Sequence, residues 1–376
     1  MSRSELHVAI CTDGVFPHAM GGMQRHSRLL AEHLAKSGRV RLTVLHPHEV
    51  GVFDPAFGID EVHVAPIDTD RIYLRELWKY SGRVGEELDR LRPDVIFSQG
   101  FCVWQGITRY SDRLIVHPHG LEMFQGLSFK ERVMGAPFRA LLRYVVRRSS
   151  VVVSLGGKLT ALLQGVTRGS KCRVVVIPNA VDMPDGPTIY PVEATPLRLL
   201  FVGRFAFNKG LDVLLSVARR FDVEGRLGDV LFELAGDGPL MENMRRDGVP
   251  RNVRVLGRVD DALLAQLYHE CHALVLPTRF EGMPTVVLEA MAHARPVLVS
   301  DVGATAELVD RTNGYLLRAG DAQELYDAVR DLCARPLAER RAMGAHGQQR
   351  VLSDFTWPVI VQRFVSLFGE PHASGK

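Results

Sequence analysis

The sequence predicts an α/β protein made of two domains with parallel sheets. The chain has 376 residues, and because single domains mostly run to roughly 100–200 residues, two domains are expected. Short runs of β-branched residues alternate with longer helical patterns along the whole chain, which is typical of β-α-β units. Apolar residues make up 46% and charged residues 24% of the chain, as in an ordinary globular protein.

In the first half we expect five strands and a helix between the first two. The strands are predicted at residues 6–11, 40–46, 94–98, 114–117 and 151–154. The helix is predicted at residues 22–36, where Leu29, Leu30, His33 and Leu34 recur at helical spacing. Gly38 follows directly, and glycine commonly ends helices.

A stretch rich in proline and polar residues separates the two halves. We interpret residues 174–179 and 183–196 as a connection without periodic structure. A second series of strands is predicted after it, at residues 197–202, 230–235, 253–256, 273–277, 297–300 and 315–317. The predicted domains are residues 1–182 and 197–352, joined by a linker at 183–196. Residues 353–376 are predicted to form a C-terminal helix that packs back on the first domain, followed by a polar tail at 372–376.

Charge and cysteine usage exclude several classes of protein. A net charge of +3 over this length does not indicate nucleic-acid binding. The five cysteines are far apart and form no Cys-x-x-Cys pair, so neither a disulfide framework nor a structural zinc site is predicted, and a reducing cytoplasm fits best. No secretory leader and no membrane-spanning run are apparent.

The loop after the predicted strand at 273–277 carries two glutamates separated by seven residues. Pro284 is expected at the first helical position, which puts Glu281 in the loop and Glu289 about a turn and a half inside the helix. The partial positive charge of that helix end suits a diphosphate. Ionised Glu289 only accepts hydrogen bonds, so it suits the two hydroxyls of a ribose.

A pair of basic residues follows the first strand of the second half. Arg204 and Lys209 lie in segment 203–210, just before a predicted helix at 211–220. Arginine offers a planar fork and lysine a point charge, so the pair suits a pyrophosphate without a metal. The same residues also fit a solvated surface turn.

Two features of the first half indicate further ligand contacts. Gly21 and Gly22 connect the first strand to its helix, where glycines let a backbone approach a ligand. The pair is not a Gly-x-Gly-x-x-Gly motif, so no NAD site is predicted. His117 and His119 close a strand, and without a third ligand in the sequence pattern they do not indicate a metal site.

These motifs resemble the family 4 retaining glycosyltransferases. The likeness covers nearly the whole chain and is strongest over residues 197–317 and weakest over 50–110. It includes residues 277–309, around the two glutamates, and segment 203–210, which resembles the family's Gly-Arg and Lys-Gly motif. The resemblance implies a GT-B fold, in which two Rossmann-like domains face each other across a donor cleft. It also implies an acceptor side on the first domain and a nucleotide-sugar site on the second.

The resemblance further implies roles for individual residues. It places Glu281 and His119 near the donor sugar, Glu289 on the ribose, and Arg204 and Lys209 on the leaving diphosphate. The predicted catalytic residues are Glu281, His119, Arg204 and Lys209. The implied donor-binding set is Gly22, Gly203, Arg204, Lys209, Arg258, Val259, Glu281, Gly282, Met283, Pro284, Thr285 and Glu289. No metal and no other cofactor is implied.

We therefore expect a transferase that moves a hexose-type sugar from a UDP- or GDP-sugar to a glycan, lipid-linked or other hydroxyl acceptor. Its expected place is cell-surface polysaccharide or glycolipid synthesis. Glycoside hydrolysis is disfavoured because one of the two glutamates is assigned to ribose rather than to the scissile bond. A GT-B sugar-nucleotide epimerase and a non-catalytic nucleotide-sugar-binding protein stay open as alternatives.

Residues 132–148 combine five arginines with apolar residues and predict a basic amphipathic helix. Such a helix suits peripheral contact with anionic lipid at the inner face of the cell membrane. It equally suits a domain helix with a solvated arginine face.

Overall fold

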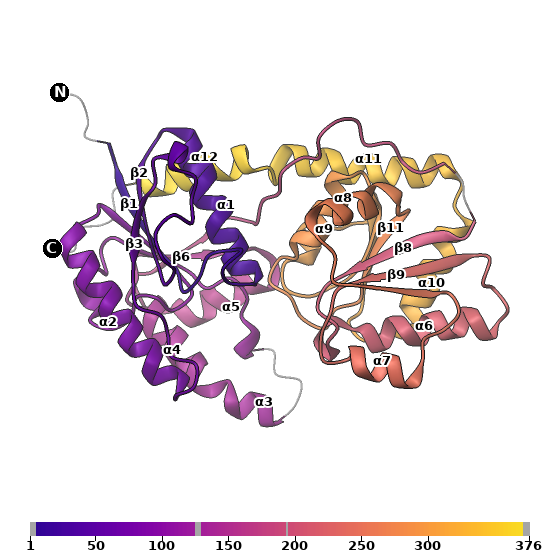
Figure 1. Cartoon of the computed structure of the whole chain (residues 1–376), viewed down its shortest axis with the longest axis horizontal. Helices are drawn as coiled ribbons and strands as arrows, with labels where there is room; N and C mark the ends of the chain where they lie inside the picture. The colour runs from indigo at the N-terminus through magenta and orange to yellow at the C-terminus, as the bar shows by residue number, and fades with distance from the viewer. Residues whose placement is uncertain (1–4, 125–128, 193–194, 371–376) are drawn as a thin grey trace. The chain divides into compact units, whose positions relative to one another are not determined.

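The computed structural model divides into two compact units (Figure 1). Unit 1 comprises Met1–Asn179 and Trp357–Lys376, and unit 2 comprises Ala180–Thr356. The structure describes residues 5–124, 129–192 and 195–370. The predicted polar tail at 372–376 lies outside these ranges.

Unit 1 is built on a seven-stranded sheet of order β3-β2-β1-β4-β5-β6-β7, in which all paired strands are parallel. The strands are β1 His7–Cys11, β2 Arg41–His46, β3 Asp60–His63, β4 Val95–Gln99, β5 Leu114–His117, β6 Val151–Ser154 and β7 Arg173–Val176. The central strands are buried on both faces, which explains their continuous apolar runs.

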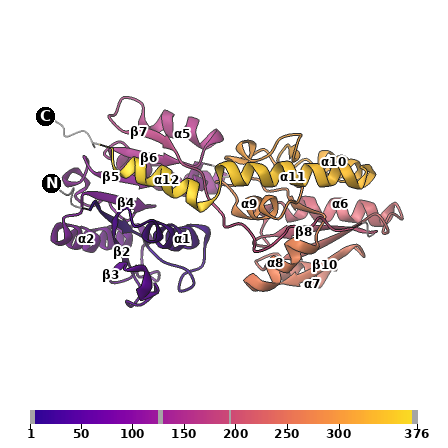
Figure 2. The same cartoon turned by 90° about the horizontal axis from the view of Figure 1, so that it is seen from above.

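Helices cover both faces of this sheet (Figure 2). They are α1 Gly22–Ser37, α2 Tyr73–Leu91, α3 Phe129–Met134, α4 Ala136–Val146, α5 Gly157–Thr167 and α12 Trp357–Phe368. Ile96 of β4 belongs to a core shared with α2 and α4. The next residue, Phe97, contacts Phe364 of α12, which packs beside α1. Because successive strand residues point to opposite faces, α1 and α12 cover one face and α2 and α4 the other.

Unit 2 repeats the architecture with a six-stranded parallel sheet of order β10-β9-β8-β11-β12-β13. The strands are β8 Leu197–Val202, β9 Val230–Ala235, β10 Val253–Gly257, β11 Ala273–Leu276, β12 Val297–Ser300 and β13 Gly314–Leu317. The helices are α6 Leu211–Val223, α7 Met241–Asp247, α8 Asp261–Glu270, α9 Thr285–Ala292, α10 Ala322–Ala334 and α11 Leu337–Asp354. In Figure 1, α8, α9 and α11 lie above these strands and α6, α7 and α10 below them.

Both strand orders reverse direction at one point, between β1 and β4 in unit 1 and between β8 and β11 in unit 2. In doubly wound sheets the loops after the strands diverge at such a point and leave a crevice where ligands bind. The fold therefore directs attention to the loops that follow these four strands.

The predicted α/β class with two parallel-sheet units is confirmed, with three local corrections. Residues 174–177 were predicted as an irregular connection, but β7 covers most of them and forms the sheet edge. The strand β3 was not predicted, since its sequence Asp-Glu-Val-His carries no apolar alternation. The single amphipathic helix predicted at 132–148 is wrong, because Gly135 separates α3 from α4 and α4 ends at Val146.

Candidate functional site

Two loops meet at the switch point of unit 2. The loop after β8 carries Lys209, the loop after β11 carries Glu281, and their side chains form an ion pair. Neighbouring bonds hold the loops together: the carbonyl of Asn208 accepts hydrogen bonds from the N–H of Arg279 at 2.8 Å and from the hydroxyl of Thr278 at 3.0 Å. Lys209 and Glu281 are thus brought together by the main chain on which they sit.

Gly210 sets how closely these two loops approach. Its backbone is left-handed, with φ +69°, and an added Cβ would lie 1.8 Å from the carbonyl oxygen of Pro277. Only glycine fits this position without moving one loop away from the other. The glycine next to Lys209 is therefore a packing requirement of the loop pair.

Arg279 fixes the same loop pair from the other side. Its guanidinium donates two hydrogen bonds of 2.7 Å to the carboxylate of Asp212 and stacks on Phe207 at 3.9 Å. This fork geometry is strong and directional. Arg279 consequently acts as a brace between the loops.

The peptide that follows Glu281 is held by the loop after β12. The N–H of Ala304 donates to the carbonyl of Gly282 at 2.9 Å. An added Cβ on Gly303 would lie 2.2 Å from the carbonyl oxygen of Glu281. The loops after β8, β11 and β12 thus together position Glu281.

The start of α9 differs by one residue from the expected start. Pro284 is the N-cap and Thr285 is the first helical residue, so the prediction that Pro284 is the first helical residue is wrong. The missing N–H of proline is equally harmless at either position. No side chain caps this helix end, and Met283 beside it is buried.

Glu289 lies on α9, half-buried, with an oriented carboxylate. The hydroxyl of Tyr268 donates to Glu289 Oε2 at 2.8 Å. Tyr268 is itself buried and stacks on His293 with ring centroids 5.1 Å apart. Because Tyr268 is fixed by its own packing, its hydrogen bond holds the carboxylate of Glu289 in one orientation.

The remaining predicted residues of unit 2 line the ends of β8 and β10. Arg204 and Arg258 are exposed, and within residues 5–124, 129–192 and 195–370 neither side chain has an ion-pair partner. Gly203 packs under Gly236, where an added Cβ would lie 1.9 Å from the Gly203 carbonyl oxygen. Val259 follows Arg258 and is half-buried. The structure does not bring Arg204 into the ion pair of Lys209 and Glu281.

His119 lies in unit 1, two residues after β5, together with Gln99 at the end of β4. Its backbone is left-handed, with φ +58°, a conformation that costs a residue with a side chain roughly 1–2 kcal/mol. One ring nitrogen, Nε2, hydrogen-bonds the side-chain oxygen of Gln99. Gly22 begins α1 after β1, is exposed, and leaves open space where a Cβ would stand.

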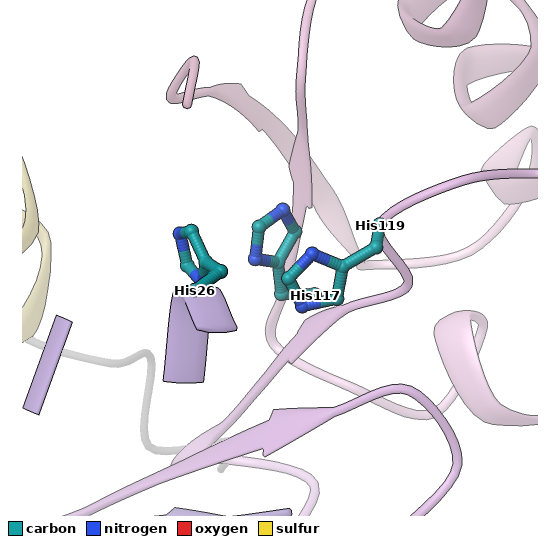
Figure 3. A group of neighbouring side chains, drawn as sticks. All are labelled: His26, His117 and His119. Atoms are coloured by element: carbon teal, nitrogen blue, oxygen red, sulfur yellow. The ribbon is translucent and has the colours of Figure 1, made fainter. Parts of the chain in front are cut away.

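Sequence reasoning missed His26, which lies on α1 beside His117 and His119 (Figure 3). Burial lowers the pKa of His26 to about 4, and burial likewise holds the pKa values of His117 and His119 well below the usual range. All three imidazoles are therefore neutral at physiological pH. In the sequence, the helical spacing from His26 to Leu30 indicates only that His26 lies on the buried face of α1. This spacing does not indicate that His26 lies beside the end of β5.

Sequence reasoning also missed Asp13, which follows β1 and lines a cavity of about 300 Å³ in unit 1. Burial raises the pKa of Asp13, and the amide of Gln24 donates to its carboxylate at 3.1 Å. His48 and Tyr73 also line this cavity. The pocket lies beyond the carboxyl ends of β1 and β2, where ligand sites are expected.

Among the described residues, no helix is both long and apolar enough to cross a membrane.

Comparisons with known proteins agree with this architecture. A family model described as Glycosyltransferase Family 4 matches residues 20–184, and one described as Glycosyl transferases group 1 matches residues 196–335. The glycogen synthase of Mycobacterium tuberculosis is 27% identical over 280 residues, which cover 72% of this chain and 67% of that protein.

Solved structures show the same fold. Sucrose-phosphate synthase from Thermosynechococcus elongatus superposes with a TM-score of 0.79 at 20% identity, covering 96% of this chain and 98% of that one. HepE from Anabaena, solved in complex with UDP and glucose, gives a TM-score of 0.67 at 18% identity, covering 96% and 99%. The chain therefore has the GT-B fold, which defines a structural class of glycosyltransferases. Within that class, the chain belongs to the family 4, group 1 glycosyl transferases.

Proposed function

We propose that the chain is a retaining transferase that moves a hexose-type sugar from a UDP- or GDP-sugar to a hydroxyl acceptor. The acceptor class is a glycan or a lipid-linked sugar, in cell-surface polysaccharide or glycolipid synthesis. The observation that carries the proposal is the ion pair of Lys209 and Glu281 at the switch point of unit 2. HepE, a structural relative, was solved with UDP and glucose, which supports a nucleotide-sugar as the donor.

In this proposal the donor diphosphate lies against Lys209 and the uncapped start of α9. A lysine ammonium and free helix N–H groups both stabilise phosphate oxygens. Arg204 and Gly203 contribute from the loop after β8. The carboxylate of Glu289, oriented by Tyr268, accepts hydrogen bonds from the ribose hydroxyls.

The other predicted donor contacts complete the proposed nucleotide site. Arg258 and Val259 contact the base from the loop after β10. Gly282, Met283, Pro284 and Thr285 form the wall of the sugar pocket through their main chain. From unit 1, Gly22 and His119 are assigned to the donor phosphate and the donor sugar, as the family resemblance implies.

The proposed reaction breaks the bond between the anomeric carbon and the phosphate oxygen and forms a bond from that carbon to the acceptor oxygen on the same face. The acceptor proton passes to the departing phosphate. Lys209 stabilises the charge that grows on the leaving diphosphate, which is where an enzyme gains most from a fixed cation. Glu281 is the carboxylate placed next to the reacting sugar.

The acceptor is assigned to the cavity that Asp13 lines in unit 1. Its volume of about 300 Å³ suits one or two sugar rings at the lower end of the range for small-molecule sites. The carboxylate of Asp13 and the amide of Gln24 would hydrogen-bond sugar hydroxyls. Tyr73 and Ile67 supply apolar surface in the same cavity.

The first experiment screens nucleotide-sugars by thermal shift and then measures release of UDP or GDP with and without glycan or membrane extracts. Release that depends on an acceptor, with the product anomer determined by NMR, supports a retaining transferase. Sugar conversion without an acceptor supports an epimerase instead. Tight binding without turnover supports a non-catalytic binding protein.

The second experiment uses two pairs of variants. Glu281→Gln is expected to lower the transfer rate more than about 100-fold, whereas Glu307→Gln, an exposed glutamate in unit 2, keeps it. Lys209→Met is expected to weaken both donor binding and rate, and Lys171→Met, exposed in unit 1, changes neither. Full activity in Glu281→Gln or Lys209→Met contradicts the assignment.

We further propose that α3 makes peripheral contact with anionic lipid. Phe129, Val133 and Met134 are exposed by 82%, 54% and 65%, and Lys130 and Arg132 lie between them. Exposed apolar side chains mixed with basic ones favour a membrane interface. The test is co-sedimentation with anionic vesicles at low salt; binding that persists unchanged in Phe129→Ser with Val133→Ser contradicts the proposal.

A further inference from the structure

We propose that His26, His117 and His119 form a binding site for a divalent metal ion of the Zn²⁺ class in unit 1. Each offers one ring nitrogen, and these three nitrogens all lie within 4.8 Å of one another. Figure 3 shows the three imidazoles gathered beside the end of β5. The proposal goes beyond sugar transfer and is tested without any sugar substrate.

The three histidines are held by rigid elements of unit 1. His26 projects from the buried face of α1, and His117 is the last residue of β5. His119 follows in a left-handed backbone conformation. The rings of His117 and His119 lie 3.9 Å apart between centroids, and each lies about 5 Å from the ring of His26. Sites built on helices and strands are more precise than sites on loops alone.

Unsatisfied polar atoms supply the strongest argument. Both ring nitrogens of His26 and both of His117 are buried, and within the described residues none of these four atoms has a hydrogen-bond partner. A buried polar atom left without a partner costs about 1–3 kcal/mol. A bound metal ion takes the lone pair of one nitrogen on each ring and so removes part of that cost.

The ligand set fits the proposed ion. Three imidazoles with an open fourth position are a known arrangement for Zn²⁺, with metal–nitrogen distances of about 2.0–2.1 Å. In a tetrahedral site such nitrogens lie about 3.3 Å apart. The observed separations are at most 4.8 Å, so binding requires side-chain rotations that bring the three nitrogens closer together.

Gln99 orients one of the three ligands. Its side-chain oxygen accepts the hydrogen bond from Nε2–H of His119, so the lone pair of that ring is on Nδ1. Histidines that bind metals usually donate their other N–H to such an acceptor. Gln99 lies at the end of β4, next to β5. In the proposed site it would not bind the metal itself but would hold the His119 ring in the orientation that presents Nδ1 to the metal.

The site also has a consequence for the proposed sugar transfer, and this part depends on that proposed function. With Nε2 engaged by Gln99, a donor-sugar hydroxyl and a metal ion both need Nδ1 of His119. Metal binding is then expected to slow transfer, and a chelator is expected to restore it. Metal binding itself is measured with no substrate, so failure of either proposal is recognised separately.

The test titrates Zn²⁺ into the full chain, purified without a polyhistidine tag and dialysed against a chelator. We expect one ion per chain by calorimetry and metal analysis, and visible absorption of four-coordinate Co²⁺ when cobalt is used instead. His26→Leu and His117→Phe each remove one ligand nitrogen and fill its buried space with an apolar side chain. Each is expected to weaken binding by more than about 100-fold. His33→Gln, a histidine of α1 outside the cluster, keeps the affinity.

Gln99→Leu provides a variant that leaves all three ligands in place. It is expected to weaken Zn²⁺ binding by about 10- to 100-fold, and thermal unfolding of each variant shows whether the fold persists. The proposal is overturned if the unaltered chain binds no Zn²⁺. It is equally overturned if folded His26→Leu or folded Gln99→Leu binds Zn²⁺ as tightly as the unaltered chain.

Discussion

Gly210→Ala is the substitution whose effect the structure defines most closely. The new Cβ would stand 1.8 Å from the carbonyl oxygen of Pro277, whereas ordinary contact begins at 3.4 Å. The loop after β8 must therefore move by about 1.6 Å relative to the loop after β11, by the difference of those distances. That movement separates Lys209 from Glu281, because each sits on one of the two loops.

The expected cost has two parts. A left-handed backbone costs alanine about 1–2 kcal/mol, and overpacking a close contact costs about 1–3 kcal/mol more. Gly38→Ala is a matched control, since Gly38 has nearly the same backbone angles and nothing within 4 Å of its would-be Cβ. Gly38→Ala should show the first part alone.

Denaturant unfolding measures the two costs, and donor-dependent nucleotide release measures the functional effect. Gly210→Ala is expected to lower the free energy of unfolding by about 2–5 kcal/mol. Because a displacement of about 1 Å can cost 100-fold in rate, transfer should fall by about that factor. Equal stability and equal rate in Gly210→Ala and Gly38→Ala would refute the reasoning.

Three further predictions test other parts of the structure. Tyr268→Phe removes the hydrogen bond to Glu289 and is expected to weaken nucleotide binding about tenfold by calorimetry; unchanged affinity contradicts the orienting role of Tyr268. Burial, with nearby arginines, lowers the pKa of His272 to about 4 from its ordinary value of 6.5. The folded protein therefore holds His272 neutral, and the contribution of this residue to the free energy of unfolding is complete above about pH 6.5 and is lost as the pH falls towards 4. The free energy of unfolding should drop by about 3 kcal/mol over that window, and an equally steep drop in His272→Gln would show that another group is responsible. Phe364→Ala opens a cavity beside Phe97 and should cost about 3–5 kcal/mol by denaturant unfolding; a loss below about 1 kcal/mol would mean that α12 adds little to unit 1.

Much of the fold was predictable because buried parallel strands need apolar residues on both faces. The strands β8 and β9 were predicted with their observed bounds for this reason. The edge strand β3 was missed because its sequence Asp-Glu-Val-His carries no apolar run. The edge strand β7 does carry a run of three valines, but Pro178 and Asn179 follow it closely, and the whole stretch was interpreted as a connection. The break at Gly135 was missed because the apolar and basic periodicity continues across it.

The candidate site was predictable only where local sequence decides the outcome. The loop position of Glu281 and the helical position of Glu289 follow from Pro284, and both agree with the structure. The bonds that hold the site are tertiary: Lys209 and Glu281 are 72 residues apart, and no local pattern links them. The same holds for His26, whose neighbours lie on a distant strand end. The functional roles of all these residues stay predictions.

The path of the chain between the two units has a practical consequence. Unit 1 is formed from two separate stretches, whereas Ala180–Thr356 is continuous. At its ends the N–H of Val181 donates to the carbonyl of Phe355 at 2.9 Å, so both ends of this stretch leave from one spot. Unit 2 is therefore an insertion in the chain of unit 1, and separating the two units requires a cut at both of its ends. Cutting the chain at residue 179 instead would deprive α1 of Trp357, which stacks on His33, and would leave a hydrophobic face open to aggregation.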